Sequence, residues 1–182
     1  MSIYQDVMSS QYASLSWKFK VNPENCENPT HYESYIRYDC HSDHKQGMGV
    51  THVFVYENEI TKEQRIAGYI TLRSSSLIMD IGQDHKTGYP ALEISELAVD
   101  KDYERQGIGT DMVKFAINQA VEMNEKSVGI QYVVLCADPK AVGFYSNSNI
   151  GFMKIRDRQD IPREGERNSN CEPMYFKIVE NN

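Results

Sequence analysis

Apolar residues are distributed differently before and after about residue 50. In the first part, a short helix within residues 1–19 is predicted by apolar positions that recur near helical spacing, namely Tyr4, Val7, Met8, Tyr12 and Leu15. Residues 22–49 combine Asn, Pro and His with a short tyrosine-rich segment, and this mixture predicts mostly loop. Residues 1–50 are therefore expected to be the least regular part of the chain.

After residue 50, strand and helix patterns follow one another in an orderly way. Two strands joined by a charged turn predict a hairpin over 51–72, and polar residues over 80–90 predict a loop. The remaining predicted elements are a strand at 92–99, a helix at 107–124, a strand at 132–136, a short helix at 139–147, and strands at 152–155 and 174–179. This order predicts a single α+β domain over 1–182, built on a mixed, largely antiparallel sheet flanked by helices.

The net charge of the 182-residue chain is −7 and its cysteines are scattered. An acidic chain argues against nucleic acid as a partner, because phosphate binding needs a basic surface. No apolar run reaches the roughly 18 residues that cross a bilayer, and the N-terminus lacks the pattern of a secretion signal. We therefore expect a cytoplasmic protein without a membrane partner, in which Cys26, Cys40, Cys136 and Cys171 are reduced thiols.

The stretch LAVDKDYERQGIGTDMV, residues 97–113, is the most informative for function. A predicted strand ends at Val99, and Gly107 and Gly109 open the predicted helix. Glycines there let the backbone approach a ligand closely, and the N–H groups of a helix N-terminus bind anions such as pyrophosphate. The alternative is that the two glycines only ease a tight strand-to-helix turn.

This stretch resembles the GNAT family of N-acetyltransferases, whose signature is Arg or Gln, two residues, Gly, one residue, then Gly or Ala. The corresponding residues here read ERQGIG, 104–109, with Glu104 in place of Arg or Gln. The resemblance implies a GNAT-like fold, acetyl-CoA as co-substrate and a cofactor-binding core over 92–152. The residues it places at the co-substrate are Leu97, Ala98, Val99, Arg105, Gln106, Gly107, Ile108, Gly109 and Thr110.

A second stretch, ADPKAVGFYSNSNIGF, residues 137–152, is similar to a later strand–helix–strand of the same family. The matching residues are Ala141, Phe144, Tyr145, Gly151 and Phe152. In the family, a tyrosine at the position of Tyr145 donates a proton to the leaving CoA thiolate, so the resemblance implies this role for Tyr145. The role suits a phenol, which is protonated at neutral pH. Asp138 replaces a frequent Asn near the pantetheine arm, and the spacing from Tyr145 to Gly151 is longer than usual. The alternative for Tyr145 is a packed aromatic residue.

The family also implies direct attack of an amine on the thioester, beside a strand that splays from the strand at 132–136. The backbone N–H near Val99 would then stabilise the developing oxyanion. Glu96 is the first candidate for the general base and Glu93 the second, and their odd separation predicts opposite faces of the strand. A solvated or salt-bridged role for each glutamate, with water as the base, is the alternative.

Two further clusters have weaker chemical interpretations. Cys40, His41 and His44 form a C-H-x-x-H pattern that Cys26 or Cys171 would complete as a metal site, although loop residues without metal are the preferred interpretation. The segment 156–167 is predicted to be a solvated hairpin loop. Its alternative is a local basic patch made of Lys154, Arg156, Arg158, Arg163 and Arg167.

Three functions are compatible with these features. The first is an N-acetyltransferase that modifies an amine of a small molecule or protein. The second is a toxin-type acetyltransferase that modifies the amino group of aminoacyl-tRNA, with tRNA as the one expected nucleic-acid partner, although such toxins are generally basic and often shorter. The third is a non-catalytic CoA-binding module, which has no need of a proton donor at Tyr145. Members of the family often form dimers, so a homodimer is a further candidate.

Overall fold

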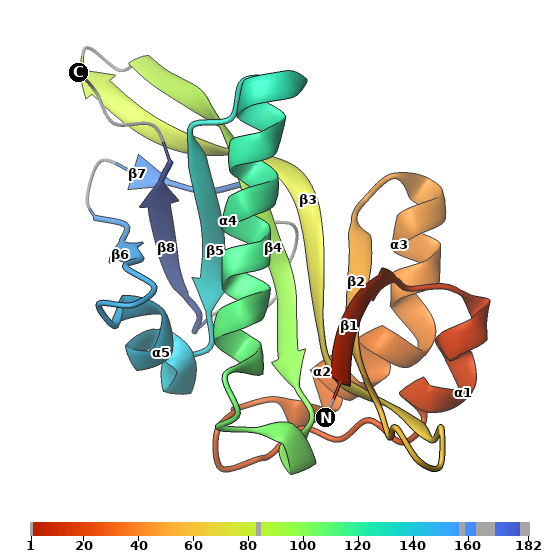
Figure 1. Cartoon of the computed structure of the whole chain (residues 1–182). Helices are drawn as coiled ribbons and strands as arrows, with labels where there is room; N and C mark the ends of the chain where they lie inside the picture. The colour runs from red at the N-terminus through yellow and green to blue at the C-terminus, as the bar shows by residue number, and fades with distance from the viewer. Residues whose placement is uncertain (1, 83–84, 157–158, 163–169, 179–182) are drawn as a thin grey trace. The chain divides into compact units, whose positions relative to one another are not determined.

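Two compact units make up the chain in this computed structural model, which describes residues 2–82, 85–156, 159–162 and 170–178 (Figure 1). One unit consists of Met1–Leu72 with Ser95–Met112, and the other of Arg73–Ile94 with Val113–Asn182. Three elements contribute residues to both units: β3 (Gln64–Gly82), β4 (His85–Val99) and α4 (Ile108–Lys126).

The first unit contains the N-terminal strands and short helices. They are β1 (Ser2–Val7), α1 (Ala13–Ser16), α2 (Pro29–Ser34), α3 (Cys40–Gln46) and β2 (Val50–Glu57), with a π-helical turn at Tyr35–Asp39 and 3₁₀ turns at Ser10–Tyr12 and Lys101–Tyr103. β1 pairs antiparallel with β2, and β2 pairs antiparallel with β3. The predicted hairpin over 51–72 is thus confirmed.

Two predictions for the N-terminal part are wrong. Residues 2–7 form a strand instead of a helix, because they pair with β2 along the whole register from Ser2↔Glu57 to Val7↔His52. The predicted loop at 22–49 contains two helices. Their ends carry local signals, since Asn28 caps α2 with Pro29 in its first turn, and Gly47 ends α3 in the left-handed region.

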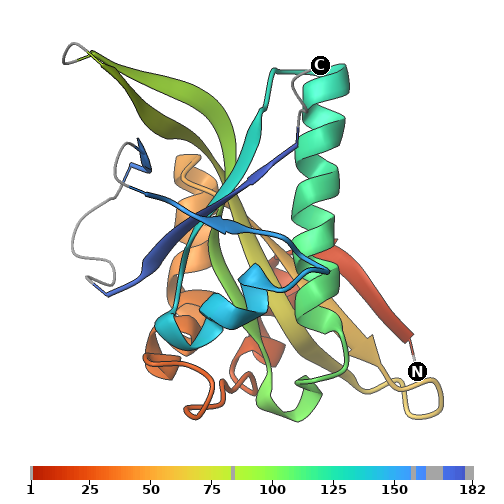
Figure 2. The same cartoon turned by 90° about the vertical axis from the view of Figure 1, so that its left-hand side faces the viewer.

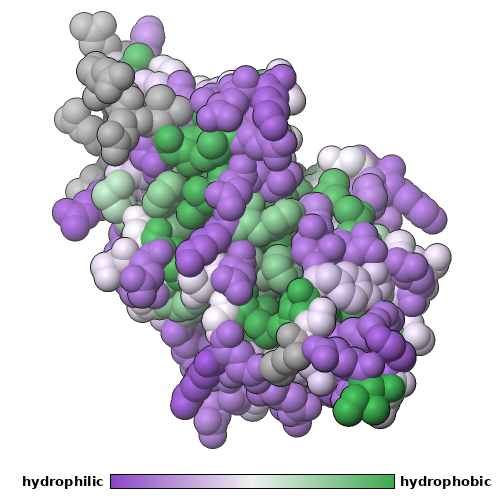
Figure 3. All heavy atoms as spheres, viewed as in Figure 1, coloured by the Kyte–Doolittle hydropathy of each residue, from purple (hydrophilic) through white to green (hydrophobic). Residues whose placement is uncertain are grey.

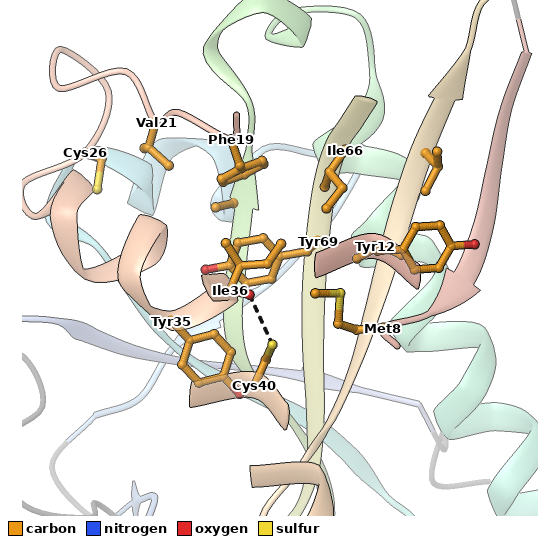
Figure 4. Close-up of a cluster of buried hydrophobic side chains, with 13 residues drawn as sticks. Met8, Tyr12, Phe19, Val21, Cys26, Tyr35, Ile36, Cys40, Ile66 and Tyr69 are labelled. Atoms are coloured by element: carbon orange, nitrogen blue, oxygen red, sulfur yellow. Dashed lines mark hydrogen bonds between the residues drawn. The ribbon is translucent and has the colours of Figure 1, made fainter. Parts of the chain in front are cut away.

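A buried aromatic and aliphatic cluster holds this unit together (Figure 4). Tyr35 stacks on Tyr69 with the ring centroids 6.1 Å apart, and the ring of Phe19 meets Tyr69 edge to face at 5.4 Å. Cys40 donates from its Sγ to the carbonyl of Ile36, one turn earlier, at 3.2 Å. Side chains from a segment that was predicted to be a loop therefore fix the helical segment 29–46 on the strands.

Gly68 on β3 lies close to Ala98 and Met112. A Cβ built at this position would meet Met112 Cε at 3.0 Å and the Ala98 carbonyl oxygen at 3.1 Å. We expect Gly68→Ala to lower the free energy of unfolding by about 1–3 kcal/mol, because the backbone oxygen of Ala98 cannot move aside as a side chain does. Urea unfolding measures the change. Gly88→Ala in β4 is the matched control, since its Cβ would meet only Ser76 at 3.6 Å, and equal losses in both variants would contradict the explanation.

The second unit contains the C-terminal strands and α5. They are β5 (Tyr132–Ala137), a 3₁₀ turn at Pro139–Ala141, α5 (Val142–Ser146), β6 (Met153–Lys154), β7 (Gln159–Asp160) and β8 (Glu172–Lys177). β4 and β5 are parallel, whereas β5 and β6 both pair antiparallel with β8, and β7 pairs antiparallel with β3. Figure 2 shows α5 as a short helix in light blue. The predicted strands at 132–136 and 174–179 and the helix at 139–147 are confirmed within one to three residues at their ends.

The loop predicted at 80–90 is wrong, because β3 continues to Gly82 and β4 already begins at His85. From Lys86 to Pro90 exposed residues alternate with half-buried Thr87 and Tyr89, as expected for a strand. The predicted fold class is confirmed: the described strands form a mixed, mostly antiparallel sheet with helices packed on it.

Helix α4 confirms the helix predicted over 107–124. Its buried positions recur at helical spacing and are Ile108, Met112, Val113, Ala116 and Ala120. Hydrophilic side chains line its outward face (Figure 3). Among the residues that the structure describes, no helix combines the length and the apolar character needed to span a membrane.

Candidate functional site

The turn from β4 to α4 holds its backbone in an unusual conformation. Arg105 and Gly107 have φ angles of 59° and 87°, in the left-handed region that glycine adopts readily. A Cβ at Gly107 would meet no atom within 4 Å, so the space above this glycine is open. The helical ladder begins directly after it, where Asp111 N–H donates to the Gly107 carbonyl at 3.0 Å. The turn therefore presents the first N–H groups of α4 beside an open glycine.

Asp100 anchors the start of this turn. Its carboxylate accepts hydrogen bonds from the backbone N–H of Lys20 at 2.8 Å and of Asp102 at 3.0 Å. Its own N–H donates to the Ala67 carbonyl, and Lys101 N–H donates to the Lys20 carbonyl at 2.8 Å. Burial raises the pKa of this carboxyl group. The segment near residue 20 thus supports the turn from outside the β4–α4 sequence.

Glu104, the departure from the family signature, has a structural function. Its Oε2 accepts hydrogen bonds from Asn22 Nδ2 at 3.2 Å and from Asn25 Nδ2 at 2.7 Å. The carboxylate therefore ties the segment before α2 to the turn. The neighbouring Arg105 and Gln106 are exposed, and Ile108 is buried beneath the first turn of α4.

Leu97, Ala98 and Val99 lie at the end of β4, where burial alternates between half-buried and buried. The register between β4 and β5 runs from Ala91↔Tyr132 to Ile94↔Leu135, and both strands continue beyond it. β5 remains paired with β8 as far as Ala137. The predicted splay beyond this register, and the oxyanion role of the N–H near Val99, stay predictions.

Glu96 is 5% exposed and has a partner that the sequence did not suggest. His31 Nε2 lies 3.0 Å from both Glu96 carboxylate oxygens. His31 comes from α2, where the N-cap Asn28 accepts a hydrogen bond from its backbone N–H at 3.2 Å. No local pattern links residues 65 positions apart, so only the fold identifies His31 as part of the site.

Glu93 is engaged differently from Glu96. Arg73 Nη2 lies 2.8 Å from its Oε1, in an ion pair whose two side chains are both largely buried. Removing one partner of such a pair leaves a buried charge without compensation. The pair therefore gives Glu93 a structural reason to be present, in line with the salt-bridged alternative, whereas its role as a base stays a prediction.

Tyr145 lies on α5 and is 6% exposed. Its ring packs edge to face on Phe144 at 4.9 Å and on Phe152 at 5.8 Å. The longer spacing to Gly151 is accommodated by Asn147, whose carbonyl accepts hydrogen bonds from Ile150 and Gly151. Phe152 N–H then donates to the Tyr145 carbonyl at 3.0 Å, so the extra residues form a turn that brings Phe152 back onto Tyr145.

Asp138 begins the 3₁₀ turn before α5 and is buried. Its carboxylate accepts a hydrogen bond from Lys140 N–H at 2.9 Å, as an N-cap does. Its predicted role at the pantetheine arm remains a prediction.

The prediction of four reduced thiols is wrong for one pair. Cys136 on β5 and Cys171 before β8 form a disulfide, whereas Cys26 and Cys40 are buried thiols outside any disulfide. The antiparallel register places Cys136 opposite Pro173 on β8, and Cys171 lies two residues before Pro173 in the chain. Tertiary pairing of strands thus joins two cysteines whose spacing in the sequence gives no signal.

The remaining two candidate clusters do not gain a function from the structure. Cys40, His41 and His44 lie on α3, not in a loop, and the described residues include no group of three or more His, Cys, Asp or Glu side chains placed to hold a metal ion. Lys154 pairs with Glu172 at 3.4 Å, whereas Arg158, Arg163 and Arg167 lie outside the described residues.

Comparison with known proteins identifies the family to which the chain belongs. The sequence model described as "Acetyltransferase (GNAT) family" matches residues 11–152. A search of curated proteins found no match.

Solved structures of similar fold cover nearly the whole chain. A tyrosine-to-phenylalanine mutant of KacT has a TM-score of 0.72 and 16% identity, with 98% of this chain and 96% of that chain covered. AtaT complexed with acetyl-methionyl-tRNAfMet has a TM-score of 0.71 and 16% identity, with 97% and 95% covered. AtaTR bound with acetyl-CoA has a TM-score of 0.67 and 18% identity, with 97% and 93% covered. At these identities, the similarity shows a shared fold.

Proposed function

Because the chain belongs to the acetyltransferase (GNAT) family, we propose that it transfers the acetyl group of acetyl-CoA to the α-amino group of an aminoacyl-tRNA. The enzyme class is that of the family, and the acceptor is the proposal. In this reaction the amine attacks the thioester directly while both substrates are bound.

The β4–α4 turn suits the phosphates of acetyl-CoA. Gly107 is open on the side where a Cβ would stand, and the adjacent N–H groups of α4 carry the partial positive charge of a helix N-terminus. Gly109 and Thr110 continue this first turn, and exposed Arg105 adds a positive charge nearby. Acetyl-CoA supplies the activated acyl group and the thiolate leaving group.

Tyr145 is proposed to donate its phenolic proton to that thiolate. Its ring is held by Phe144 and Phe152, so the hydroxyl has a fixed direction. A donor that is positioned before the reaction loses little entropy in reaching the transition state. Glu96 is the proposed acceptor of the proton that the amine must lose.

One observation carries the choice of acceptor: the similarity to KacT and AtaT structures extends over 97–98% of this chain and so includes the N-terminal segment. AtaT has been captured with acetyl-methionyl-tRNAfMet, a product of α-amino acetylation. In this proposal, residues 1–50 shape the acceptor side and residues 92–152 hold acetyl-CoA.

The net charge of −7 favours a second candidate, an amine of a small molecule or protein. A tRNA substrate usually meets a basic surface, because counterion release from phosphates supplies much of the affinity. The two acceptors therefore need to be compared in one assay.

We expect purified protein to move radiolabel from [acetyl-¹⁴C]acetyl-CoA to aminoacylated tRNA and not to the same tRNA after deacylation. Mild alkali hydrolyses the aminoacyl ester and should release the label from the tRNA. Labelling of small amines or protein amines without labelled tRNA would support the second candidate instead. Absence of transfer to every amine tested would overturn the proposed acetyl transfer.

A further inference from the structure

His31 and Glu96 form a pair with one buried and one accessible end. The Glu96 side chain is 5% exposed and the His31 side chain 32% exposed, and His31 Nε2 lies 3.0 Å from each carboxylate oxygen. Nε2 is therefore equidistant from the two carboxylate oxygens. A proton that reaches Glu96 therefore has a hydrogen-bonded exit through an imidazole that meets water.

The imidazole is held in place from several sides. Its ring meets Tyr32 edge to face at 5.1 Å and lies 6.4 Å from the ring of Tyr35. The next acidic residue on α2, Glu33, is bound by Lys20 at 2.8 Å and by Arg37 at 3.1 Å. The carboxylate of Glu33 is thus paired with two cationic side chains.

Tyr69 is a second ionisable group near the Glu96 carboxylate. Burial, and next the charge of Glu96, raise the pKa of Tyr69 well above its ordinary value. Its hydroxyl donates to the Tyr32 carbonyl at 2.9 Å, so it has an acceptor other than Glu96. Tyr69 therefore remains neutral, whereas the imidazole of His31 has two ring nitrogens, of which one can accept a proton while the other donates one.

We propose that Glu96 and His31 act as one unit that takes a proton from the acceptor ammonium and releases it to solvent through His31. Glu96 receives the proton, and His31 is a positioning residue that orients the carboxylate and carries the proton away. This inference rests on the proposed acetyl transfer. It adds a histidine from the N-terminal segment to the machinery on β4.

The protons balance over one turnover. The substrate ammonium loses its first proton to the Glu96–His31 pair and becomes a nucleophilic amine. Formation of the C–N bond and cleavage of the C–S bond then release a second proton from nitrogen, while the sulfur takes one from Tyr145. The second proton restores Tyr145 and the first leaves through His31, so the products are the acetylated amine, CoA thiol and one proton.

The test compares His31→Ala and His31→Gln with wild type at pH 6.5, with His44→Gln on α3 as a matched control. We expect kcat to fall about 10-fold in both His31 variants, with KM for acetyl-CoA unchanged, and to remain normal in the control. An α-amino group titrates near pH 7.7–8.0, so the deficit in initial rate should shrink by about pH 8.5, where most of the acceptor is already deprotonated. Exogenous imidazoles should restore His31→Ala in proportion to their basicity, which a purely structural role does not predict.

The experiments distinguish failure of the proposed Glu96–His31 pair from failure of the proposed acetyl transfer. Active wild type with unaltered His31 variants, or with rescue that is independent of basicity, would overturn the role of the pair. Wild type without transfer to any amine would overturn the proposed function. The pair would then be tested by ¹⁵N NMR of the His31 ring: a ring ¹⁵N spectrum that changes in Glu96→Gln supports the pair, and an identical spectrum in that variant refutes it.

Discussion

Tyr145→Phe is expected to lower kcat for acetyl transfer about 100-fold to 1,000-fold and to leave the affinity for acetyl-CoA unchanged. General acid catalysis by a positioned side chain contributes factors of this size, and phenylalanine has no proton to give to the thiolate. The substitution keeps the ring that packs on Phe144 and Phe152, so the local structure should persist. Single-turnover kinetics at saturating acetyl-CoA measure the chemical step, and a binding titration measures the affinity.

Tyr132→Phe provides the matched control for this experiment. Tyr132 is 7% exposed, close to the 6% of Tyr145, and its ring also packs edge to face on two other aromatic rings. Loss of its hydroxyl should leave kcat within about twofold of wild type. Unchanged turnover in Tyr145→Phe would mean that the thiolate leaves without help from this residue, and Tyr145 would then be a packing residue.

The elements that the sequence predicted well are those with strong local patterns. β5 is a continuous apolar run, and its residues are buried on both faces at Val133 and Val134. The buried positions of α4 recur every three or four residues. Gly107 was expected either to let a ligand approach the backbone closely or to ease a tight strand-to-helix turn, and its φ of 87° lies in the left-handed region that suits such a turn. In each case the information lies within a few neighbouring residues.

The elements that were missed depend on contacts over long separations. β1 is a strand because β2 offers it a partner, although its own apolar residues recur near a helical period. The disulfide joins cysteines 35 residues apart, brought together by the pairing of β5 with β8. The contact of His31 with Glu96 spans 65 residues, and no local rule relates them. The helices at 29–46 are a different case, since the capping signals Asn28 and Gly47 were present and were outweighed by the loop-forming composition.

The N-terminal segment supports the β4–α4 region at three successive points. Lys20 binds the start of the turn through Asp100, and Asn22 and Asn25 bind Glu104. His31 then binds Glu96 on β4 itself. Glu104 in place of an Arg has a reason in this arrangement, because a carboxylate accepts hydrogen bonds from both amide groups whereas a guanidinium has no acceptor. The segment expected to shape only the acceptor side therefore also positions the turn and the proposed base.

Gly107→Val is expected to weaken acetyl-CoA binding about 100-fold. At a φ of 87° a β-branched residue is strongly disfavoured, so the turn must leave its left-handed conformation, and the N–H groups at the start of α4 then change direction. The phosphates lose donors that were positioned in advance. At a concentration 100 times the wild-type Kd, acetyl-CoA should stabilise the wild type by about 2.7 kcal/mol and the variant by roughly 0.4 kcal/mol. Thermal unfolding with and without ligand measures both values.

Backbone strain by itself would also destabilise the variant, and Gly47→Val separates strain from binding. Gly47 has a φ of 70° and, like Gly107, has no atom within 4 Å of a built Cβ, but it lies at the end of α3. Both variants should lose stability without ligand, because both force a branched side chain into the left-handed region. Only Gly47→Val should keep the full stabilisation by acetyl-CoA. Equal stabilisation of the two variants would mean that acetyl-CoA binds without the β4–α4 turn, and the assignment of the phosphate site to Gly107 would have to be abandoned.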